Sequence, residues 1–284
     1  MSVPSAVPAP LPHFSAEDAQ YRAPRPVGPV LTLQNKRAFR NPKKLLDKAG
    51  VAPATLCCEG VPEEVPPGIL AVGRLPEMAP VRAVEWSWKS PLAGDEHLLV
   101  NFLAAPAFAD LDSLWLDGAP TEDGGVHRRS GRFLATLLQT GRLPSQHLHL
   151  AGLTIDVPAI RSLRAWEGFG RLLSCRLTWA LGGRRWSRLL GTIPSDNHLR
   201  FLELSWSDLG DAGLESLLGR PLPHLEQLVL QQVGLTDVGA RRLLGWPGLD
   251  RLRWLDLGGN DLSDDVLAEL EARLGDRLRA EPAH

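Results

Sequence analysis

Two histidines, His147 and His149, are separated by a single residue, so both imidazoles share one face if the segment is a strand. Imidazoles bind metals, transfer protons or form hydrogen bonds with a partner. A zinc site needs three or four ligands in tetrahedral arrangement. In the strand register derived below, only Asp117 is an obvious third ligand, and Arg176 on the other side would repel a cation. We therefore predict no metal and no other cofactor, and interpret the pair as hydrogen-bonding contacts to a partner. A zinc site, or an enzyme that uses the pair, is the alternative.

Other signals of catalysis are missing from the sequence, which contains no G-x-x-x-x-G-K-[ST], G-x-S-x-G or H-E-x-x-H motif. The Gly-Gly-Arg-Arg run at 182–185 lacks the lysine and hydroxyl of a phosphate loop and is interpreted as a polar turn. Three cysteines, Cys57, Cys58 and Cys175, are too few for a disulfide framework. Cys175 aligns with core leucines, which predicts a buried, unreactive thiol. The chain is predicted not to be an enzyme.

The elements that position these residues follow from a leucine pattern that recurs every 26 or 27 residues, at 199–204, 225–230 and 252–257. Alternation along each strand points Leu202 and Leu204 into the core and Phe201 and Glu203 to the opposite face. Apolar residues then recur at helical spacing: Leu214, Leu217 and Leu218; Ala240, Leu243 and Leu244; Leu267 and Leu270. A fixed period of this length predicts a solenoid of stacked strand-and-helix units.

Weaker copies of the pattern extend upstream to Val81, and a degenerate copy surrounds Cys57. The step from Leu114 to Leu148 is 34 residues, which predicts added loop length in the polar run 121–131. Thr236 and Ser263 stand where helix N-caps belong.

The segments Leu-Thr-Asp-Val-Gly-Ala (235–240), Leu-Gly-Asp-Ala-Gly-Leu (209–214) and Leu-Ser-Asp-Asp-Val-Leu (262–267) resemble leucine-rich-repeat proteins of the ribonuclease-inhibitor-like branch. The resemblance implies an α/β horseshoe with a parallel sheet on the concave wall, helices outside and a role in protein recognition. The family's asparagine, which satisfies backbone groups where the chain leaves the strand, is matched by Asn260. Equivalent positions in the two preceding units hold Ser207 and Val233.

The strand residues opposite the core leucines form a ladder on the concave wall, and we expect this ladder to face solvent. Aromatic residues and arginine supply much of the energy at protein interfaces. The predicted partner-binding residues are Trp115, Asp117, His147, His149, Arg176, Phe201, Glu203 and Trp254. This predicts a non-enzymatic protein–protein interaction module; the alternative is an inhibitor or immunity-type protein that blocks a partner enzyme. Truncating exposed Trp115 or Phe201 would then leave the melting temperature nearly unchanged.

Two further sets of residues recur at the repeat period. Trp88, Trp179 and Trp206 share a position just past the strand, which favours stacking between neighbouring turns, with an aromatic rim to the binding wall as the alternative. His198 and His224 each precede the first leucine of a unit, which favours a shared role in the loop over catalysis.

The chain divides into three predicted parts: a Pro-rich mobile leader (1–29), an N-terminal cap with a degenerate repeat (30–80) and the solenoid (81–284). The cap is predicted to contain a strand at 30–33 and a helix that starts at Asn41-Pro42. The basic cluster at 36–48 is interpreted as a solvated helix face, with a binding patch as the alternative. A net charge of −2 and the lack of a long apolar segment favour a cytoplasmic protein that binds neither nucleic acid nor membrane.

Overall fold

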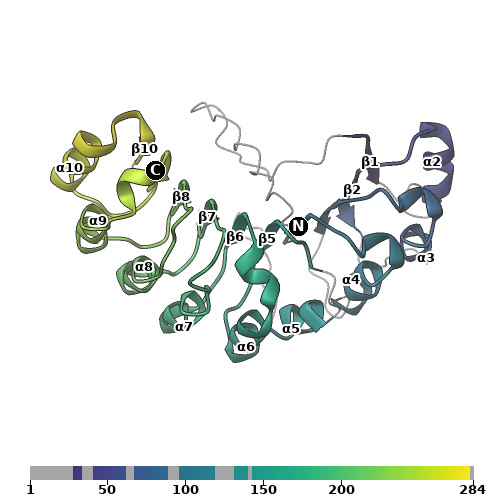
Figure 1. Ribbon diagram of the computed structural model, residues 1–284, viewed down its shortest axis with the longest axis horizontal. Coiled ribbons are helices and arrows are strands. Elements are labelled where there is room, and N and C mark those ends of the chain that lie inside the picture. Colours follow the sequence, from purple (N-terminus) through teal and green to yellow (C-terminus); the bar gives the residue numbers. More distant parts are fainter. Residues whose placement is uncertain are drawn as a thin grey trace, which may run out of the picture.

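The computed structural model describes residues 28–33, 41–61, 67–88, 96–118, 131–139 and 143–281. Over these residues the chain forms an open arc, with strands along its inner side and helices along its outer side (Figure 1). The strands form one parallel sheet whose spatial order follows the sequence from β1 to β10. This is the predicted α/β horseshoe solenoid.

The strands are short, and several comprise only two or three residues. They are β1 (Val30–Leu33), β2 (Thr55–Val61), β3 (Ala83–Trp88), β4 (Ser113–Asp117), β5 (His147–Ala151), β6 (Ser174–Thr178), β7 (Phe201–Glu203), β8 (Gln227–Val229), β9 (Trp254–Asp256) and β10 (Leu278–Arg279). The outer helices are α2 (Pro42–Ala49), α3 (Pro67–Val72), α4 (Glu96–Leu103), α5 (Gly131–Gln139), α6 (Val157–Ala165), α7 (Trp186–Leu190), α8 (Gly210–Leu218), α9 (Asp237–Leu244) and α10 (Asp264–Leu274).

One apolar core runs through the whole arc, from Leu31 to Leu274. The strand register places Cys175, Leu202 and Leu228 side by side on consecutive strands, and all three are buried. The helices contribute the predicted stripes, for example Leu214 and Leu217, which are fully buried. In α10 the prediction was partly wrong, because Val266, Leu270 and Leu274 form the buried stripe and Leu267 is only half-buried.

The turns after β5, β6, β7, β8 and β9 use a residue in the left-handed region of backbone conformation. This position holds Gly152, Trp179, Trp206, Gln232 and Gly259 in successive units, with φ between 49° and 73°. For a residue with a Cβ, this conformation costs roughly 1–2 kcal/mol of free energy. The indole rings of Trp179 and Trp206 stack, with centroids 4.8 Å apart and planes 14° apart. The prediction of stacking between turns is confirmed for this pair; the side chain of Trp88 lies outside the described part of the chain.

Asn260 joins two successive units through its side-chain amide. Its Oδ1 accepts from the backbone N–H groups of Val233 and Leu235, each at 3.1 Å. Its Nδ2 donates to the carbonyl oxygens of Leu230 and Leu257 at 2.7 and 2.8 Å. The predicted role of this asparagine in satisfying backbone groups is confirmed.

Carboxylates tie neighbouring units together on the outer side of the strands. Asp211 accepts from the N–H and hydroxyl of Thr236, and Asp237 accepts from the N–H and hydroxyl of Ser263, at 2.6–3.0 Å. Thr236 is the predicted N-cap of α9, accepting from the Val238 N–H at 3.2 Å. Ser263 is the N-cap residue of α10 but its side chain makes no capping bond. Its hydroxyl donates to Asp237.

The Gly-rich turn at 182–185 also holds a carboxylate, that of Asp208 in the next unit. The N–H groups of Gly182 and Gly183 donate to its two oxygens at 2.7 and 2.9 Å, and Trp186 Nε1 donates to Oδ1 at 2.8 Å. The anion-binding geometry of this turn is thus satisfied within the protein, in agreement with its interpretation as a structural turn.

The N-terminal cap has the predicted strand β1 and helix α2, whose N-cap Asn41 accepts from the Lys44 N–H. The degenerate unit around Cys57 is confirmed by β2, which pairs with β1 and β3. Strand β10 was not predicted. The leader up to residue 27, the basic residues at 36–40 and the loop 121–130 lie outside the described residues. Lys43 of the basic cluster is bonded to Asp47 and Glu77 at 2.9 and 3.1 Å.

Because each unit contacts only its neighbours, a core cavity in one unit weakens both adjoining interfaces. Leu228 is fully buried, and we expect Leu228→Ala to lower the free energy of unfolding by about 2–5 kcal/mol. Val238→Ala is the matched control, since Val238 is 54% exposed and its truncation is expected to cost less than about 0.5 kcal/mol. Urea denaturation of both variants measures the difference; equal losses would contradict the assigned core.

Candidate functional site

The predicted ladder residues lie side by side on the inner wall of the arc. In the central row, the register pairs Glu85 with Trp115, Trp115 with His149, His149 with Arg176 and Arg176 with Glu203. The row in front of it contains His147, Ser174 and Phe201. The sequence pattern therefore predicted correctly which side chains share this face, although they are far apart in the chain.

The central row forms a continuous cluster of aromatic and charged groups. The Trp115 and His149 rings stack with centroids 3.8 Å apart, and the Arg176 guanidinium carbon lies 4.7 Å from the Trp115 ring centroid. Arg176 Nη2 forms an ion pair with Glu203 Oε2 at 2.6 Å. His149 Nε2 lies 3.4 Å from Asp117 Oδ1. Each of these side chains is held by a neighbour on an adjacent strand, so the surface they form is preorganised.

The expectation that the whole ladder faces solvent was wrong. Phe201 is 1% exposed, and His147, His149 and Glu203 are also buried, with exposed fractions of 5–6%. The physical reason is geometric. Adjacent strands are only about 4.8 Å apart, and on the inner side of an arc their side chains converge, so that larger groups cover their neighbours. Trp115, Asp117, Arg176 and Trp254 are partly exposed and form the accessible part of the predicted set, although the Arg176 side chain is only 12% exposed.

Burial determines the protonation of the two histidines. It lowers the pKa of His147 to about 4, against a weaker opposing effect of Asp112, and the Nδ1 of His147 is hydrogen-bonded to Ser174 Oγ at 2.9 Å. Burial and the nearby Arg176 charge hold the pKa of His149 well below its usual range. Both rings are therefore neutral at neutral pH. For Glu203, burial raises the pKa and the Arg176 charge opposes that rise.

Metal binding was the alternative for this histidine pair. Within the described parts of the chain, no three His, Cys, Asp or Glu side chains come together in an arrangement that could hold a metal ion. The cysteines are free thiols and buried, and burial raises the pKa of Cys175 to about 12 and that of Cys58 well above its usual value. Thiolate chemistry at these two positions is correspondingly disfavoured.

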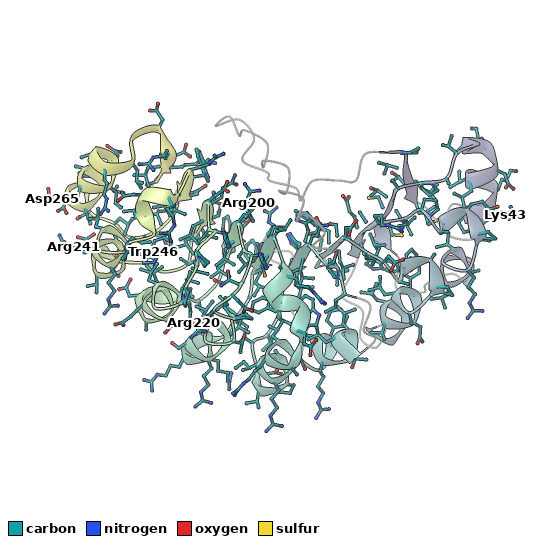
Figure 2. The ribbon with its side chains drawn as sticks, in the orientation of Figure 1. Lys43, Arg200, Arg220, Arg241, Trp246 and Asp265 are labelled. Atoms are coloured by element: carbon teal, nitrogen blue, oxygen red, sulfur yellow. The ribbon has the colours of Figure 1, made fainter. Side chains whose placement is uncertain are left out.

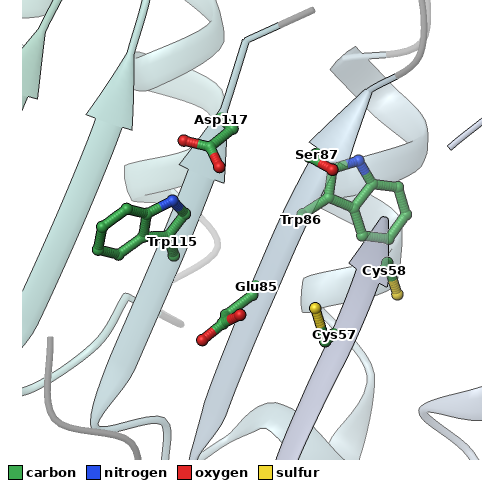
Figure 3. Close-up of a pocket in the computed structure, with 7 residues that line it drawn as sticks. All are labelled: Cys57, Cys58, Glu85, Trp86, Ser87, Trp115 and Asp117. Atoms are coloured by element: carbon green, nitrogen blue, oxygen red, sulfur yellow. The ribbon is translucent and has the colours of Figure 1, made fainter. Parts of the chain in front are cut away.

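A hollow of about 310 Å³ opens on the inner wall beside the cluster, across β2, β3 and β4 (Figure 3). Its polar lining comes from Glu85, Ser87 and Asp117, and its aromatic lining includes the Trp115 indole. Two carboxylates beside an indole suit a cationic group, which gains ion pairing and cation–π attraction together. Glu85 and Ser87 were missing from the predicted site, although both belong to the same ladder as Trp115 and Asp117.

Trp254 lies apart from this cluster. It stands on β9, three strands beyond β6, where its neighbour in the register is Gln227. The polar groups next to it are Asp256 and Gln231, which are joined by a 2.7 Å hydrogen bond. The predicted residues therefore form one connected cluster on β4–β7 and one separate aromatic position on β9.

The fold and this wall define a repeat scaffold with an open inner surface. A protein family described as Leucine Rich repeat matches residues 195–218, which include β7 and the whole of α8. Together with the horseshoe fold, this match supports a leucine-rich-repeat architecture.

Comparison with solved structures supports the same architecture. A crystal structure of a Bacteroides fragilis protein aligns with a TM-score of 0.50 and 14% sequence identity, over 75% of this chain and 68% of the other. At this identity the likeness concerns the fold alone. No curated protein matches the chain. None of the helices in the described segments is long and apolar enough to cross a membrane.

The burial of Phe201 reverses the expected effect of its truncation on stability. Phe201→Ala removes a buried aromatic side chain, so we expect it to lower the free energy of unfolding by about 3–5 kcal/mol. Chemical denaturation measures this loss. An unchanged melting temperature would instead support the exposed position that the sequence pattern predicted.

The two buried histidines predict a pH dependence of stability. Below the ordinary histidine pKa the unfolded chain takes up protons that folded His147 and His149 do not, so these residues make stability fall as the pH is lowered from about 6.5 to 4. Each contributes a slope of up to about 1.4 kcal/mol per pH unit in that window. The buried acids Glu203 and Asp256 act in the opposite direction.

We therefore expect the double variant His147→Gln/His149→Gln to flatten the acid side of the curve of unfolding free energy against pH relative to wild type, as measured by urea unfolding at several pH values. Parallel curves would show that the histidines are accessible to protons.

Proposed function

We propose that this leucine-rich-repeat protein is a non-enzymatic interaction module that docks a partner protein on the inner wall of its arc. The observation that carries the proposal is the hollow beside Trp115, where an indole and two carboxylates line one concavity. Leucine-rich repeats commonly mediate protein–protein contacts, which agrees with this assignment. The partner chemistry that fits the hollow is a lysine or arginine side chain, received by Glu85 and Asp117 and covered by the Trp115 ring.

Burial divides the predicted binding residues into two groups with different roles. Trp115, Asp117 and Arg176 are accessible and are proposed to contact the partner, with Trp254 as an outlying contact. His149 supports the Trp115 ring by stacking, and Glu203 fixes the Arg176 guanidinium by its ion pair. Side chains that are already ordered lose less conformational entropy on binding, so the buried group supports affinity without touching the partner.

We also infer that the chain belongs with the long-repeat, ribonuclease-inhibitor-like branch of leucine-rich-repeat proteins. In support, the C-terminal units have a period of 26 or 27 residues and carry α-helices of 8–11 residues, α8, α9 and α10, on the outer side of the arc.

Site-specific crosslinking tests the proposed binding surface. A photoreactive amino acid placed at Asp117 is expected to capture a host protein that the same group at Arg164, exposed on the outer helix α6, does not capture. With the captured partner in hand, Trp115→Ala should weaken its affinity by about tenfold or more, as expected for an aromatic hot spot. Arg164→Ala should leave it unchanged.

Two results would count against the proposal. Capture from Arg164 but not from Asp117 would move the interface to the outer helices. An unchanged affinity of the folded Trp115→Ala variant would remove the hollow from the interface. An enzyme assay of the captured partner, with and without this protein, distinguishes simple docking from inhibition.

A further inference from the structure

A second surface lies at the edge of the sheet where the chain enters the C-terminal strands. The residue directly before the first core leucine of each unit is Arg171, His198, His224 or Arg251 in consecutive units, and all four are exposed. We call these four residues the basic strip. The equivalent residue of the β4 unit is the exposed Asp110. The fold therefore accepts an acid at this position, so its requirements do not account for the basic strip.

The strip borders a hollow of about 440 Å³ that is distinct from the one on the inner wall. His198 and His224 line it with parallel rings, whose centroids are 5.8 Å apart and whose planes differ by 6°. Pro223, Leu173 and Leu225 add apolar surface. The hollow thus combines apolar surface and two stacked imidazoles with the guanidinium groups of Arg200 and Arg251.

The balance of charge at this edge is positive. Arg200 donates to Glu226 Oε1 through Nε at 2.9 Å and through Nη2 at 2.6 Å. Arg253 Nε lies 3.7 Å from the other oxygen, Glu226 Oε2. One carboxylate is therefore shared by two guanidinium groups. Arg251 donates to the Leu222 carbonyl oxygen at 3.3 Å, and among the described residues no carboxylate lies within ion-pair distance of it. This local excess of positive charge contrasts with the net charge of −2 of the whole chain.

The strip ends at Arg251. In the next unit Arg277 ends the 3-10 helix before the strand, as Arg251 does, but it directly precedes Leu278, the register partner of Leu255. The Arg277 guanidinium is used within the fold, because it donates to the carbonyl oxygens of Leu274, Asp250, Leu252 and Arg273. Arg251 makes a single hydrogen bond to a backbone carbonyl oxygen, that of Leu222, and also lines the hollow.

We propose that the basic strip binds an acidic segment of a partner protein, with a carboxylate received by Arg251 and His224 and an apolar side chain placed against the histidine and proline surface. A protein segment fits better than a nucleic acid. Glu226 lines the hollow itself, and Asp196 and Asp250 lie two and one residues before members of the strip. A polyphosphate backbone would meet these acids, whereas a peptide can place single carboxylates between them.

The strip is independent of the proposed site on the inner wall. The inner hollow is formed by β2, β3 and β4, and the strip precedes β6, β7, β8 and β9. The two surfaces therefore use different units and opposite kinds of charge. A partner could be held by its basic group at the first surface and by an acidic segment at the second.

A matched pair of charge reversals tests the strip in the full-length protein. The probe is a fluorescein-labelled peptide with three Ser-Glu-Leu-Asp repeats, and binding is followed by fluorescence anisotropy at low salt. We expect Arg251→Glu to weaken binding by about tenfold or more. Arg241→Glu, an equal charge change on the outer helix α9 (Figure 2), should change it by less than about twofold. His198→Ala/His224→Ala should also weaken binding, whereas Trp115→Ala should have no effect and so separates this proposal from the previous one.

Three outcomes would overturn the proposal: equal losses from Arg251→Glu and Arg241→Glu, equal affinity for the uncharged Ser-Gln-Leu-Asn version of the peptide, or the lack of saturable binding. Tighter binding of single-stranded DNA than of the acidic peptide would replace a protein partner by a nucleic acid. Circular dichroism checks that each variant is folded. If Arg251→Glu is not, the neutral pair Arg251→Gln and Arg241→Gln makes the same comparison.

Discussion

Contact between successive units is the constraint on which this structure depends. Each strand finds its hydrogen-bonding partners in the strands before and after it, and each set of buried leucines is covered by the adjacent sets. The free energy gained by burying the side chains of one unit is smaller than the conformational entropy cost of ordering its backbone. A unit is therefore stable only within the array. Polar side chains follow the same rule: Asn260, Asp208, Asp211 and Asp237 all satisfy backbone groups in a neighbouring unit.

The same constraint shapes the functional surface. A parallel register with short strands places one residue from each unit in a row, and the curvature of the arc brings these side chains into contact. Trp115, His149 and Arg176 consequently stack across three strands. Burial keeps the histidines neutral. They serve as fixed supports for the indole and guanidinium groups beside them. The sequence pattern had instead predicted that these histidines contact a partner.

Much of the architecture could be predicted from the sequence, because period and alternation are local properties. They placed the core positions of Leu202 and Leu228 and the ladder order from Glu85 to Glu203 correctly. The exposure of ladder residues could not be predicted, since alternation indicates the face of a side chain and says nothing of the curvature that buries Phe201. Strand β10 was missed because it has only two residues, Leu278 and Arg279, too few to show alternation. The hollow beside Trp115 and the hydrogen bonds from the Gly-rich turn to Asp208 depend on distances between units. A sequence pattern within one unit does not contain those distances.

The stacked indoles of Trp179 and Trp206 give this protein a built-in optical marker. Two such chromophores held 4.8 Å apart couple their electronic transitions, and any twist between their transition dipoles produces a paired band in the circular dichroism spectrum. Each ring belongs to a different turn of the array, so the amplitude of that band reports how closely the two turns stay together. Bending or opening of the arc in solution can therefore be followed without attaching a label.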